Sequence, residues 1–402
     1  MPQSVVLDTV RRGRLCTGCG ACAAIVPEVR MLRSRTGFHR PVTDVPLDAG
    51  QDNDIAAICP GLRLETKRTG EDDALWGRIL SLQVGYASDA DIRFRASSGG
   101  ALSALLVHLL ESNAVDFVLQ TSAAPDDPIA NRTVCTTDAQ QVILAAGSRY
   151  APSSPLAGIE RHLASGKRFA FVGKPCDVAA LRAMSRHDPR VRANVRCMIS
   201  FFCAGVPSRL GAQEVLKRLG VQPGFLKAFR YRGHGWPGSV VATLKDGSIR
   251  QMSYRDSWGG VLSRHVQFRC KICPDGTGNE ADIVCADAWH GDTDGYPSFE
   301  EADGQSLTLA RTENGDAILR DAIAAGAIQS KSCSVAEIEK MQPGQVSRMR
   351  ALVARLAALW ITMQPRPVFK GFRLFHLSRG AGVLVQIRNF LGTGKRVVLG
   401  RR

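Results

Sequence analysis

The chain has 402 residues, enough for two or three domains, and 45% of them are hydrophobic against 22% charged, a balance that excludes a disordered protein. Its net charge of +15 is concentrated at one end, because residues 341–402 hold twelve Lys or Arg and no Asp or Glu. The rest of the chain carries only +3, so we expect a body that binds no nucleic acid and a basic tail with a separate role.

The first residues lack the apolar core of a signal peptide, and no run reaches the roughly 18 apolar residues that a membrane-spanning helix requires. We therefore expect a cytoplasmic protein. Because that compartment is reducing, twelve cysteines indicate metal binding or redox chemistry rather than disulfides.

Near the N-terminus, the segment CTGCGAC places three cysteines at two-residue gaps: Cys16, Cys19 and Cys22. Thiolates at this spacing can turn inward from one loop onto an inorganic core, and Gly18 and Gly20 suit the positive φ angles of such a loop. Cys59, followed by Pro60, is the expected fourth ligand of a [4Fe–4S] cluster, although it lies farther away than in bacterial ferredoxins. A zinc site is the alternative. We expect residues 1–80 to form a small, loop-rich, ferredoxin-like region around this site.

From residue 82 onward, predicted strands and helices alternate. Strands are expected at 84–87, 115–119, 169–173, 197–202 and 281–289, and helices at 101–110, 159–163 and 178–184. This alternation predicts an α/β body with a mixed sheet, which we divide into domains 81–160 and 161–335, before a basic helical tail at 336–402. Within the body, residues 225–260 look antiparallel, with a hairpin turn at Asp246-Gly247.

Four further cysteines come from three separate elements of this body: Cys176, Cys203, Cys270 and Cys273. The first two follow buried-looking strands, where ligands gather in an open α/β sheet, and the last two form a Cys-x2-Cys hook. The four could hold a second [4Fe–4S] cluster, or they could be plain buried thiols. Cys285, inside a probable strand, competes for a ligand position. The remaining cysteines are expected in the core: Cys135, Cys197 and Cys333.

The four residues Ser97, Ser98, Gly99 and Gly100 precede the helix expected at 101–110. Free amides and the helix dipole would favour a phosphate there, whereas an ordinary serine N-cap is the commoner explanation of such a turn. Lys174, after a buried strand, could meet a phosphate or the edge of a flavin. His234 and His290 are candidate proton donors.

Taken together, these motifs resemble one family, the beta subunit of coenzyme F420 hydrogenase/dehydrogenase and its relatives. The resemblance runs from about residue 12 to about residue 295. It rests on CTGCGAC with the distant Cys59-Pro60, SSGGALSALL, GSRYAPS, FVGKPCDVAALR, FFCAGVPS, YRGHGWPG, and CKIC followed by ADIVCADAW, in this order.

The family resembled here consists of iron–sulfur flavoproteins that bind FAD and one or two [4Fe–4S] clusters. Its members pass electrons between ferredoxin or a partner subunit and a deazaflavin or another organic acceptor. Relatives include 7-hydroxymethyl chlorophyll a reductase and ferredoxin-dependent divinyl chlorophyllide 8-vinyl reductase.

Carried onto matching positions, the resemblance implies two ligand sets, one of Cys16, Cys19, Cys22 and Cys59 and one of Cys176, Cys203, Cys270 and Cys273. The turn at 97–100 and Lys174 would lie at the FAD and substrate cleft. Independently of the resemblance, protonation would need a donor near the flavin, for which His290, Asp287 and His234 are the candidates. Ala286 stands where the family usually has Gly, and Ala204 where it usually has His, so the substrate does not carry over.

We therefore expect an iron–sulfur flavoprotein oxidoreductase that connects ferredoxin or another electron-transfer protein with a small organic acceptor. The alternative is a non-catalytic electron-transfer subunit of a larger redox complex. The tail lies outside the resemblance. Its segment 346–363 reads as a basic amphipathic helix that could lie on an anionic membrane surface at the inner face, dock an acidic ferredoxin, or simply pack on its own body.

Overall fold

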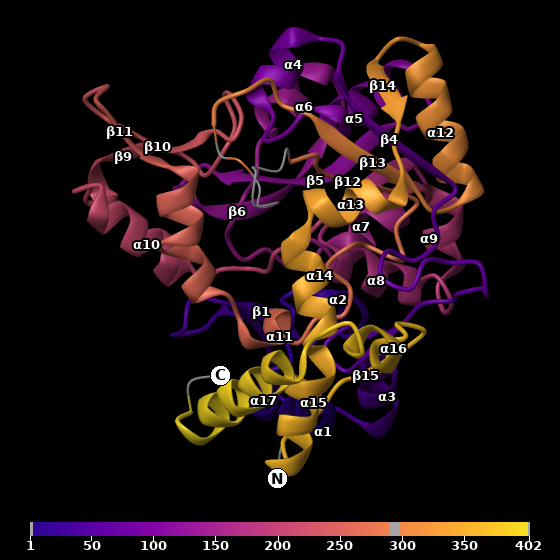
Figure 1. Ribbon diagram of the computed structural model, residues 1–402, viewed down its shortest axis with the longest axis vertical. Coiled ribbons are helices and arrows are strands. Elements are labelled where there is room, and N and C mark those ends of the chain that lie inside the picture. Colours follow the sequence, from indigo (N-terminus) through magenta and orange to yellow (C-terminus); the bar gives the residue numbers. More distant parts are fainter. Residues whose placement is uncertain (1–2, 290–297, 299, 401–402) are drawn as a thin grey trace.

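The computed structural model describes residues 3–289, 298 and 300–400, and its centre is an eight-stranded mixed sheet (Figure 1). The strand order is β14-β4-β13-β12-β8-β7-β5-β6. Their bounds are β4 (Ser81–Ala87), β5 (Phe117–Ala124), β6 (Asp127–Thr136), β7 (Phe169–Val172), β8 (Val195–Phe201), β12 (Ile283–Asp287), β13 (Ser306–Ala310) and β14 (Ile328–Ser332). The central strands β5, β7, β8 and β12 are parallel and the outer pairs antiparallel, which confirms the predicted α/β fold with a mixed sheet.

Helices cover both faces of this sheet. One face is packed by α5 (Ala101–Glu111) and α12 (Glu313–Ala324). The other is packed by α7 (Ile159–Ala164), α8 (Pro175–Met184) and α9 (Pro189–Asn194). Because its two faces are both covered, the short strand β7 is buried along its whole length, which is why its sequence FAFV is continuously apolar. Short helices α4 (Ala90–Arg95) and α6 (Ala139–Leu144) flank α5.

A separate antiparallel sheet projects at the left of Figure 1, as the sequence predicted for residues 225–260. It consists of β9 (Leu226–Arg230), β10 (Ser239–Leu244) and β11 (Ile249–Ser253). The hairpin between β10 and β11 turns at Gly247, whose φ of +86° is a conformation that glycine adopts without strain. This sheet shares a hydrophobic core with α10 (Arg209–Arg218), and three short helical turns at 223–225, 255–259 and 262–265 complete the unit.

The N-terminal region packs below the α8 face of the large sheet. Its elements are α1 (Val5–Arg12), α2 (Ala21–Ile25), β1 (Arg30–Arg33), β2 (His39–Val42), α3 (Ala49–Ile58) and β3 (Arg63–Glu65). Cys19, Ala21 and Ile58 share a core with residues of α8. The region is therefore fixed against the body, close to the ends of the central strands.

The basic tail forms α13 (Val335–Met341), α14 (Pro343–Arg350), α15 (Leu352–Ile361), β15 (Val368–Lys370), α16 (Leu374–Ser378) and α17 (Val383–Val398). The prediction of a single helix over 346–363 is wrong, because the structure has two helices that meet at Ala351. The division follows the packing: Val346 and Met349 of α14 join the core under the large sheet, whereas Leu352 and Leu359 of α15 pack against the N-terminal region. Segment 343–361 thus packs on its own body.

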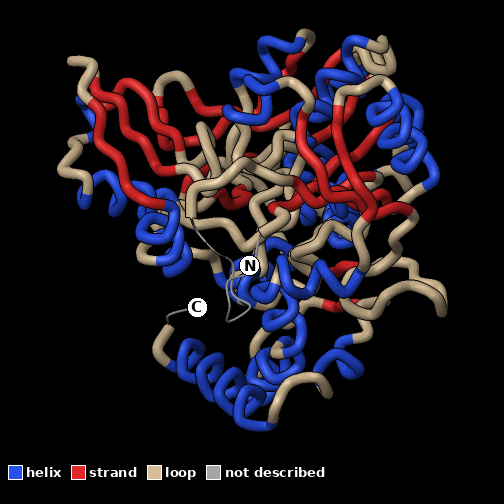
Figure 2. The backbone as a smooth tube through the Cα atoms, turned by 45° about the horizontal axis from the view of Figure 1, so that its top comes forward, coloured by secondary structure: helices blue, strands red, loops and turns tan. Residues whose placement is uncertain are grey.

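The last tail helices gather below the sheets (Figure 2), and β15 pairs in parallel with β3. Among the described residues, no helix has both the length and the apolar character needed to cross a bilayer.

Candidate functional site

The first predicted cysteine set is brought together by the N-terminal region. Cys16 and Cys19 lie in the loop before α2, Cys22 lies inside α2, and Cys59 ends α3. Gly20 allows this arrangement, because its φ is +88° and a Cβ there would come within 2.7 Å of the backbone nitrogen of Ala157. The loop therefore packs tightly against the segment that leads into α7.

The thiols of this set lie close enough to influence one another's ionisation. Burial raises the pKa of Cys19 to about 12, with added contributions from Asp177, Cys59 and Cys16. Burial and the charge of Cys16 raise the pKa of Cys59 to about 11. Burial and the charges of the other three thiols raise the pKa of Cys22 well above its ordinary value. Such a set of buried thiolates is unfavourable unless a cationic group binds it.

The second cysteine set lies where the central strands end. Cys176 is in the first turn of α8, after β7, and Cys203 follows β8. Cys270 belongs to α11 (Phe268–Lys271), and its sulfur accepts a hydrogen bond from the amide of Val206 at 3.4 Å. Burial, then Cys270 and Cys273, raises the pKa of Cys203 to about 12. Burial, followed by the charges of Asp177, Cys203 and Cys270, raises the pKa of Cys176 well above its ordinary value. The thiols of this set therefore also lie near one another.

The other cysteines are not part of these two groups. Burial alone raises the pKa of Cys285 to about 12, and the side chain lies in β12. Cys197 is buried in β8 as expected, but the core position predicted for Cys135 and Cys333 is wrong. Cys135 is exposed because β6 is an edge strand, and Cys333 is only half-buried after β14. Among the residues described, no three His, Cys, Asp or Glu side chains converge at the spacing of a single bound ion.

Two side chains beside the CKIC hook connect the two cysteine sets. The side-chain amide of Gln267 donates to the carbonyl oxygen of Thr17 at 3.1 Å and approaches the sulfur of Cys270 at 3.5 Å. Arg269, 1% exposed, donates to the carbonyl oxygen of Pro60 at 2.7 Å. Its Nε and Nη1 find no hydrogen-bond partner among the described residues.

The charge of Arg269 reaches both sets. Burial raises the pKa of Cys59 and of Cys273, and in each case the positive charge of Arg269 opposes that rise. A buried cation is costly unless anions surround it. The buried charge of Arg269 would therefore be stabilised by negative charge held at both cysteine sets.

The tail also contributes to the second set. Arg348 of α14 donates to the carbonyl oxygen of Cys203 at 3.0 Å, and the side-chain amide of Gln345 donates to the same oxygen at 3.3 Å. Gln345 also donates to the carbonyl oxygen of Gly276 at 3.4 Å. Helix α14 thus holds the loop that carries Cys203 in place through these hydrogen bonds.

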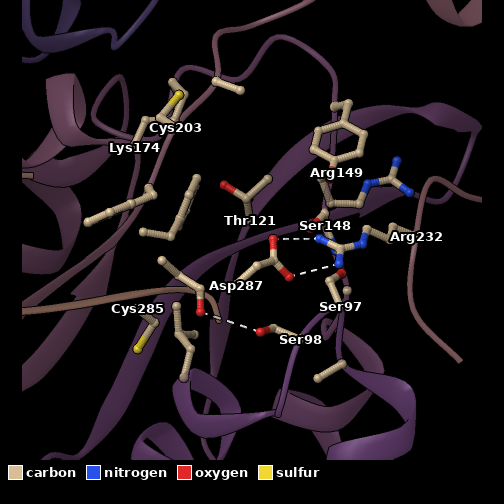
Figure 3. A pocket seen from close by; sticks show the side chains of 18 of the residues that line it. Ser97, Ser98, Thr121, Ser148, Arg149, Lys174, Cys203, Arg232, Cys285 and Asp287 are labelled. Carbon is tan, nitrogen blue, oxygen red and sulfur yellow. Dashed lines mark hydrogen bonds and ion pairs between the residues drawn. The ribbon is translucent and has the colours of Figure 1, made fainter. Parts of the chain in front are cut away.

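A cavity of about 310 Å³ opens at the carboxyl ends of β7, β8 and β12 (Figure 3). Lys174 and Cys203 lie on one side of it, and Arg232 and Asp287 on the other. Aromatic side chains make up much of the remaining wall: Tyr150, Phe201, Phe202, Tyr254, Trp258 and Trp289. The cavity therefore lies directly beside the second cysteine set.

The predicted turn at 97–100 forms part of the cavity wall. The amide of Ser148 donates to the hydroxyl of Ser97, and the hydroxyl of Ser98 donates to the carbonyl oxygen of Gln305 at 2.7 Å. Gly99 packs behind the wall, where a Cβ would come within 2.6 Å of the backbone nitrogen of Ser306. Gly100 has a φ of +79° and starts α5. The serines hold the turn in place, and the glycines allow its close packing.

Lys174 is a buried charge at the cavity. Its Nζ donates to Oδ2 of Asp177 at 2.6 Å and to the hydroxyl of Ser153 at 2.9 Å. Burial opposes the charged form, but the charges of Asp177, Cys176 and Cys203 outweigh it and raise the pKa of Lys174. Lys174 therefore stays protonated at neutral pH.

The three candidate proton donors are placed differently. Asp287 faces the cavity, but its carboxylate accepts two hydrogen bonds from Arg232, at 2.7 and 2.8 Å, and one from Trp236 at 3.2 Å. His234 is exposed on a loop, with its ring centroid 5.3 Å from that of Phe94, and does not line the cavity. His290 lies outside the described residues.

Several residues of the site were not predicted from sequence. Arg232 lies within the motif YRGHGWPG, and Arg269 directly precedes CKIC. Their positions in or beside these motifs were the sequence feature that could have identified them. Arg149 of GSRYAPS donates four hydrogen bonds that tie β6 to β9 and holds the cavity wall. No sequence motif indicated a role for Gln345 and Arg348, because the tail lies outside the motifs.

Comparison with known proteins identifies the body. Residues 82–160 match the family model for the N-terminal part of the coenzyme F420 hydrogenase/dehydrogenase beta subunit, and residues 166–336 match the model for its C-terminal part. The coenzyme F420 hydrogenase subunit beta of Methanococcus voltae is 28% identical over 268 residues, which are 64% of this chain and 84% of that protein. The F420-dependent formate dehydrogenase 1 subunit beta of Methanococcus maripaludis is 27% identical, over 61% of this chain and 60% of that protein.

A similar fold occurs in a chain of the F420-reducing [NiFe] hydrogenase complex from Methanosarcina barkeri. The two superpose with a TM-score of 0.54 at 21% identity, over 71% of this chain and 95% of that chain. The fold and the two sequence matches, which together span more than half of the residues, agree. The chain therefore belongs to the coenzyme F420 hydrogenase/dehydrogenase beta subunit family.

Proposed function

We propose that this chain is an iron–sulfur flavoprotein oxidoreductase with two [4Fe–4S] clusters and FAD. It would pass electrons between ferredoxin or another electron-transfer protein and a small organic acceptor. The observation that carries the proposal is that the thiols of each predicted set lie near enough to influence one another's ionisation. Gln267 and Arg269 connect the two sets, and the second set borders the cavity. An oxidoreductase role agrees with relatives named as a coenzyme F420 hydrogenase and a formate dehydrogenase.

The residues at both thiol sets fit iron–sulfur clusters. All donors are sulfur, the ligand that such clusters require, and each set gathers buried thiols whose negative charges would otherwise repel one another. The orphaned guanidinium nitrogens of Arg269 could donate to cluster or cysteine sulfur. Cys16, Cys19, Cys22 and Cys59 would hold one cluster, and Cys176, Cys203, Cys270 and Cys273 the other.

The lining of the cavity suits the aromatic ring and the phosphates of a cofactor such as FAD. Its walls combine aromatic rings with the charged Lys174 and the glycine turn at 97–100. Bound clusters would supply one-electron transfer, and bound FAD would convert it into two-electron chemistry at an organic acceptor. Two of the three N–H groups of Lys174 are engaged by Asp177 and Ser153, which leaves one to orient a group in the cavity. Asp287 would hold Arg232 in place rather than donate a proton, because its oxygens already accept hydrogen bonds.

Electrons would enter through a groove of about 830 Å³ beside Cys16. Its cationic lining consists of Arg11, Arg14, Arg40, Arg264 and Lys271. Among the described residues that line it, Asp8 is the one acid, and it is paired with Arg11 at 2.6 Å. Because ferredoxins of the acidic type carry complementary charge, this groove would guide such a protein to the first cluster.

Charge reversal in this groove tests the entry route. Arg264→Glu should slow reduction by an acidic ferredoxin at least several-fold at low salt, and should leave reduction by dithionite unchanged. Arg192→Glu, at an exposed position of α9 outside the groove, provides the matched control. Equal ferredoxin rates in the two variants would show that electrons enter elsewhere.

Ligand variants test the two clusters separately. Cys19→Ser and Cys273→Ser should each remove about half of the iron and leave flavin bound, since each set would hold one of two equal clusters. Cys135→Ser, at an exposed position, should change neither. A Cys19 variant that keeps all of its iron would show that this thiol is not a ligand.

The second candidate function is a non-catalytic electron-transfer subunit. It is favoured by the names of the relatives, which are beta subunits, and by the structural neighbour, which is a chain of a complex. Flavin that is reduced by a partner, in a chain that turns over no organic acceptor by itself, would support this alternative. A colourless protein with stoichiometric zinc would instead support the structural zinc site.

A further inference from the structure

Helix α17 carries its aliphatic side chains on the side that faces away from the protein. Val383, Leu384, Ile387, Leu391 and Val398 are between 49% and 82% exposed. Their spacing places them on one face of an α-helix. Monomeric proteins rarely expose so continuous an apolar surface unless something binds it.

The opposite face of α17, which packs against α15, is largely polar, and Val397 near its end is the aliphatic side chain of α17 that joins the cluster of Leu352 and Leu359. The side-chain amide of Gln386 donates to the carbonyl oxygen of Ser378 at 2.9 Å. Asn389 accepts a hydrogen bond of 3.0 Å from Arg355, and Thr393 is buried. A helix that merely covered its own protein would carry most of its aliphatic groups inside, whereas most of those of α17 are exposed. The outward face therefore points to a binding partner outside this chain.

The charge around this face indicates what kind of partner it fits. Arg388 and Lys395 lie exposed at its border, and residues 341–402 contain no acidic residue at all. Figure 1 shows α15 and α17 together at the lower end of the molecule, and Trp360 in the last turn of α15 is exposed as well. A second copy of this basic surface would be repelled, whereas an anionic surface would be attracted.

We propose that α17 lies flat on an anionic phospholipid surface. The five aliphatic side chains would enter the boundary between headgroups and acyl chains, while Arg388 and Lys395 pair with lipid phosphates. Neither step needs the clusters or the flavin, so this proposal stands or falls independently of the redox function.

Vesicle flotation of the full-length holoprotein tests the proposal. The chain should float with vesicles that contain about a third phosphatidylglycerol in phosphatidylcholine, several-fold more than with pure phosphatidylcholine, and high salt should reduce the difference. Leu384→Glu/Leu391→Glu should abolish flotation. The matched control is Leu144→Glu/Ile249→Glu, which makes the same change at apolar side chains of the body that are 70% and 58% exposed.

Circular dichroism and melting temperature should confirm that both double variants are folded. Equal flotation of the α17 variant and the control would overturn the proposal, as would a wild-type chain that does not float with anionic vesicles. A wild-type chain that stays off vesicles but sediments as a dimer, with a monomeric α17 variant, would reassign this face to a protein interface.

Discussion

Arg269 donates a hydrogen bond of 2.7 Å to the carbonyl oxygen of Pro60, and this bond joins the neighbour of Cys270 to the neighbour of Cys59. One buried cation thereby lies between the two cysteine sets that the sequence pattern suggested separately. The two proposed clusters would then both lie near the charge of Arg269. A substitution of this residue should therefore alter the properties of both clusters.

Replacement of Arg269 tests that relationship. In Arg269→Met, both cluster reduction potentials should become more negative, by on the order of 50 mV, because a nearby positive charge no longer favours the added electron. A redox titration followed by electron paramagnetic resonance measures both shifts. Arg269→Lys, which keeps the charge, should restore most of the difference. A shift confined to one cluster would contradict the shared position.

Removal of the Asp287 carboxylate should destabilise the cavity. In Asp287→Asn, the guanidinium of Arg232, 2% exposed, would lose its charged partner. Because Asp287 is itself 21% exposed, we expect a loss of about 2–3 kcal/mol in the free energy of unfolding, below the range for a fully buried pair. Denaturant titration measures the loss.

A second variant separates the structural role of Asp287 from a catalytic one. Arg232→Met/Asp287→Leu removes both charges and should recover part of the lost stability. If Asp287→Asn leaves stability and flavin content unchanged but abolishes turnover, Asp287 acts as a proton donor and not as the support of Arg232.

The glycine before α2 should be essential for the first cluster. Gly20→Ala combines a left-handed conformation, which costs about 1–2 kcal/mol with a side chain, with the 2.7 Å approach to Ala157. Iron content should fall by about half. Gly166→Ala, also left-handed with a φ of +66° but with nothing within 4 Å of its Cβ, bears only the conformational cost and should keep its iron. Similar iron loss in both variants would rule out close packing as the cause.

His39 should make stability depend on pH. Burial, together with the charges of Lys174, Arg33 and Arg40, lowers the pKa of His39 in the folded protein. The folded state therefore binds the proton less well than the unfolded chain, and stability is lost as pH falls below about 6.5.

Melting temperatures between pH 5 and 8 measure this dependence. His39→Gln keeps a polar side chain near Ser154, which contacts His39 at 3.0 Å, but cannot titrate. Its melting temperature should fall less on acidification than that of the wild-type chain. Parallel curves for the two proteins would show that other groups set the acid limit.

The sequence predicted the parts of the structure that depend on local pattern. The strand FAFV, the helix from Ala101 and the hairpin at Gly247 follow from periodicity and turn chemistry, and all are confirmed. The break at Ala351 was missed because no Gly or Pro marks it, and two separate cores impose it. Local propensity carries no information about which core a helix will join.

The candidate site divides in the same way. Spacing pointed to Cys16, Cys19 and Cys22 and to the Cys270 and Cys273 pair, and a place directly after an apolar strand pointed to Cys176 and Cys203. The links through Gln267, Arg269 and Arg348 depend on contacts between segments that are far apart in the chain, from 145 residues for Arg348 with Cys203 to 250 for Gln267 with Thr17. Such contacts follow only from the assembled fold.

Anaerobic purification, with iron, sulfide, zinc and flavin quantified per chain, tests the central claim most directly. Two [4Fe–4S] clusters and one flavin predict about eight irons, about eight sulfides and one FAD. About four irons would leave a single cluster and contradict the second set. Zinc without iron or flavin would contradict the redox function altogether.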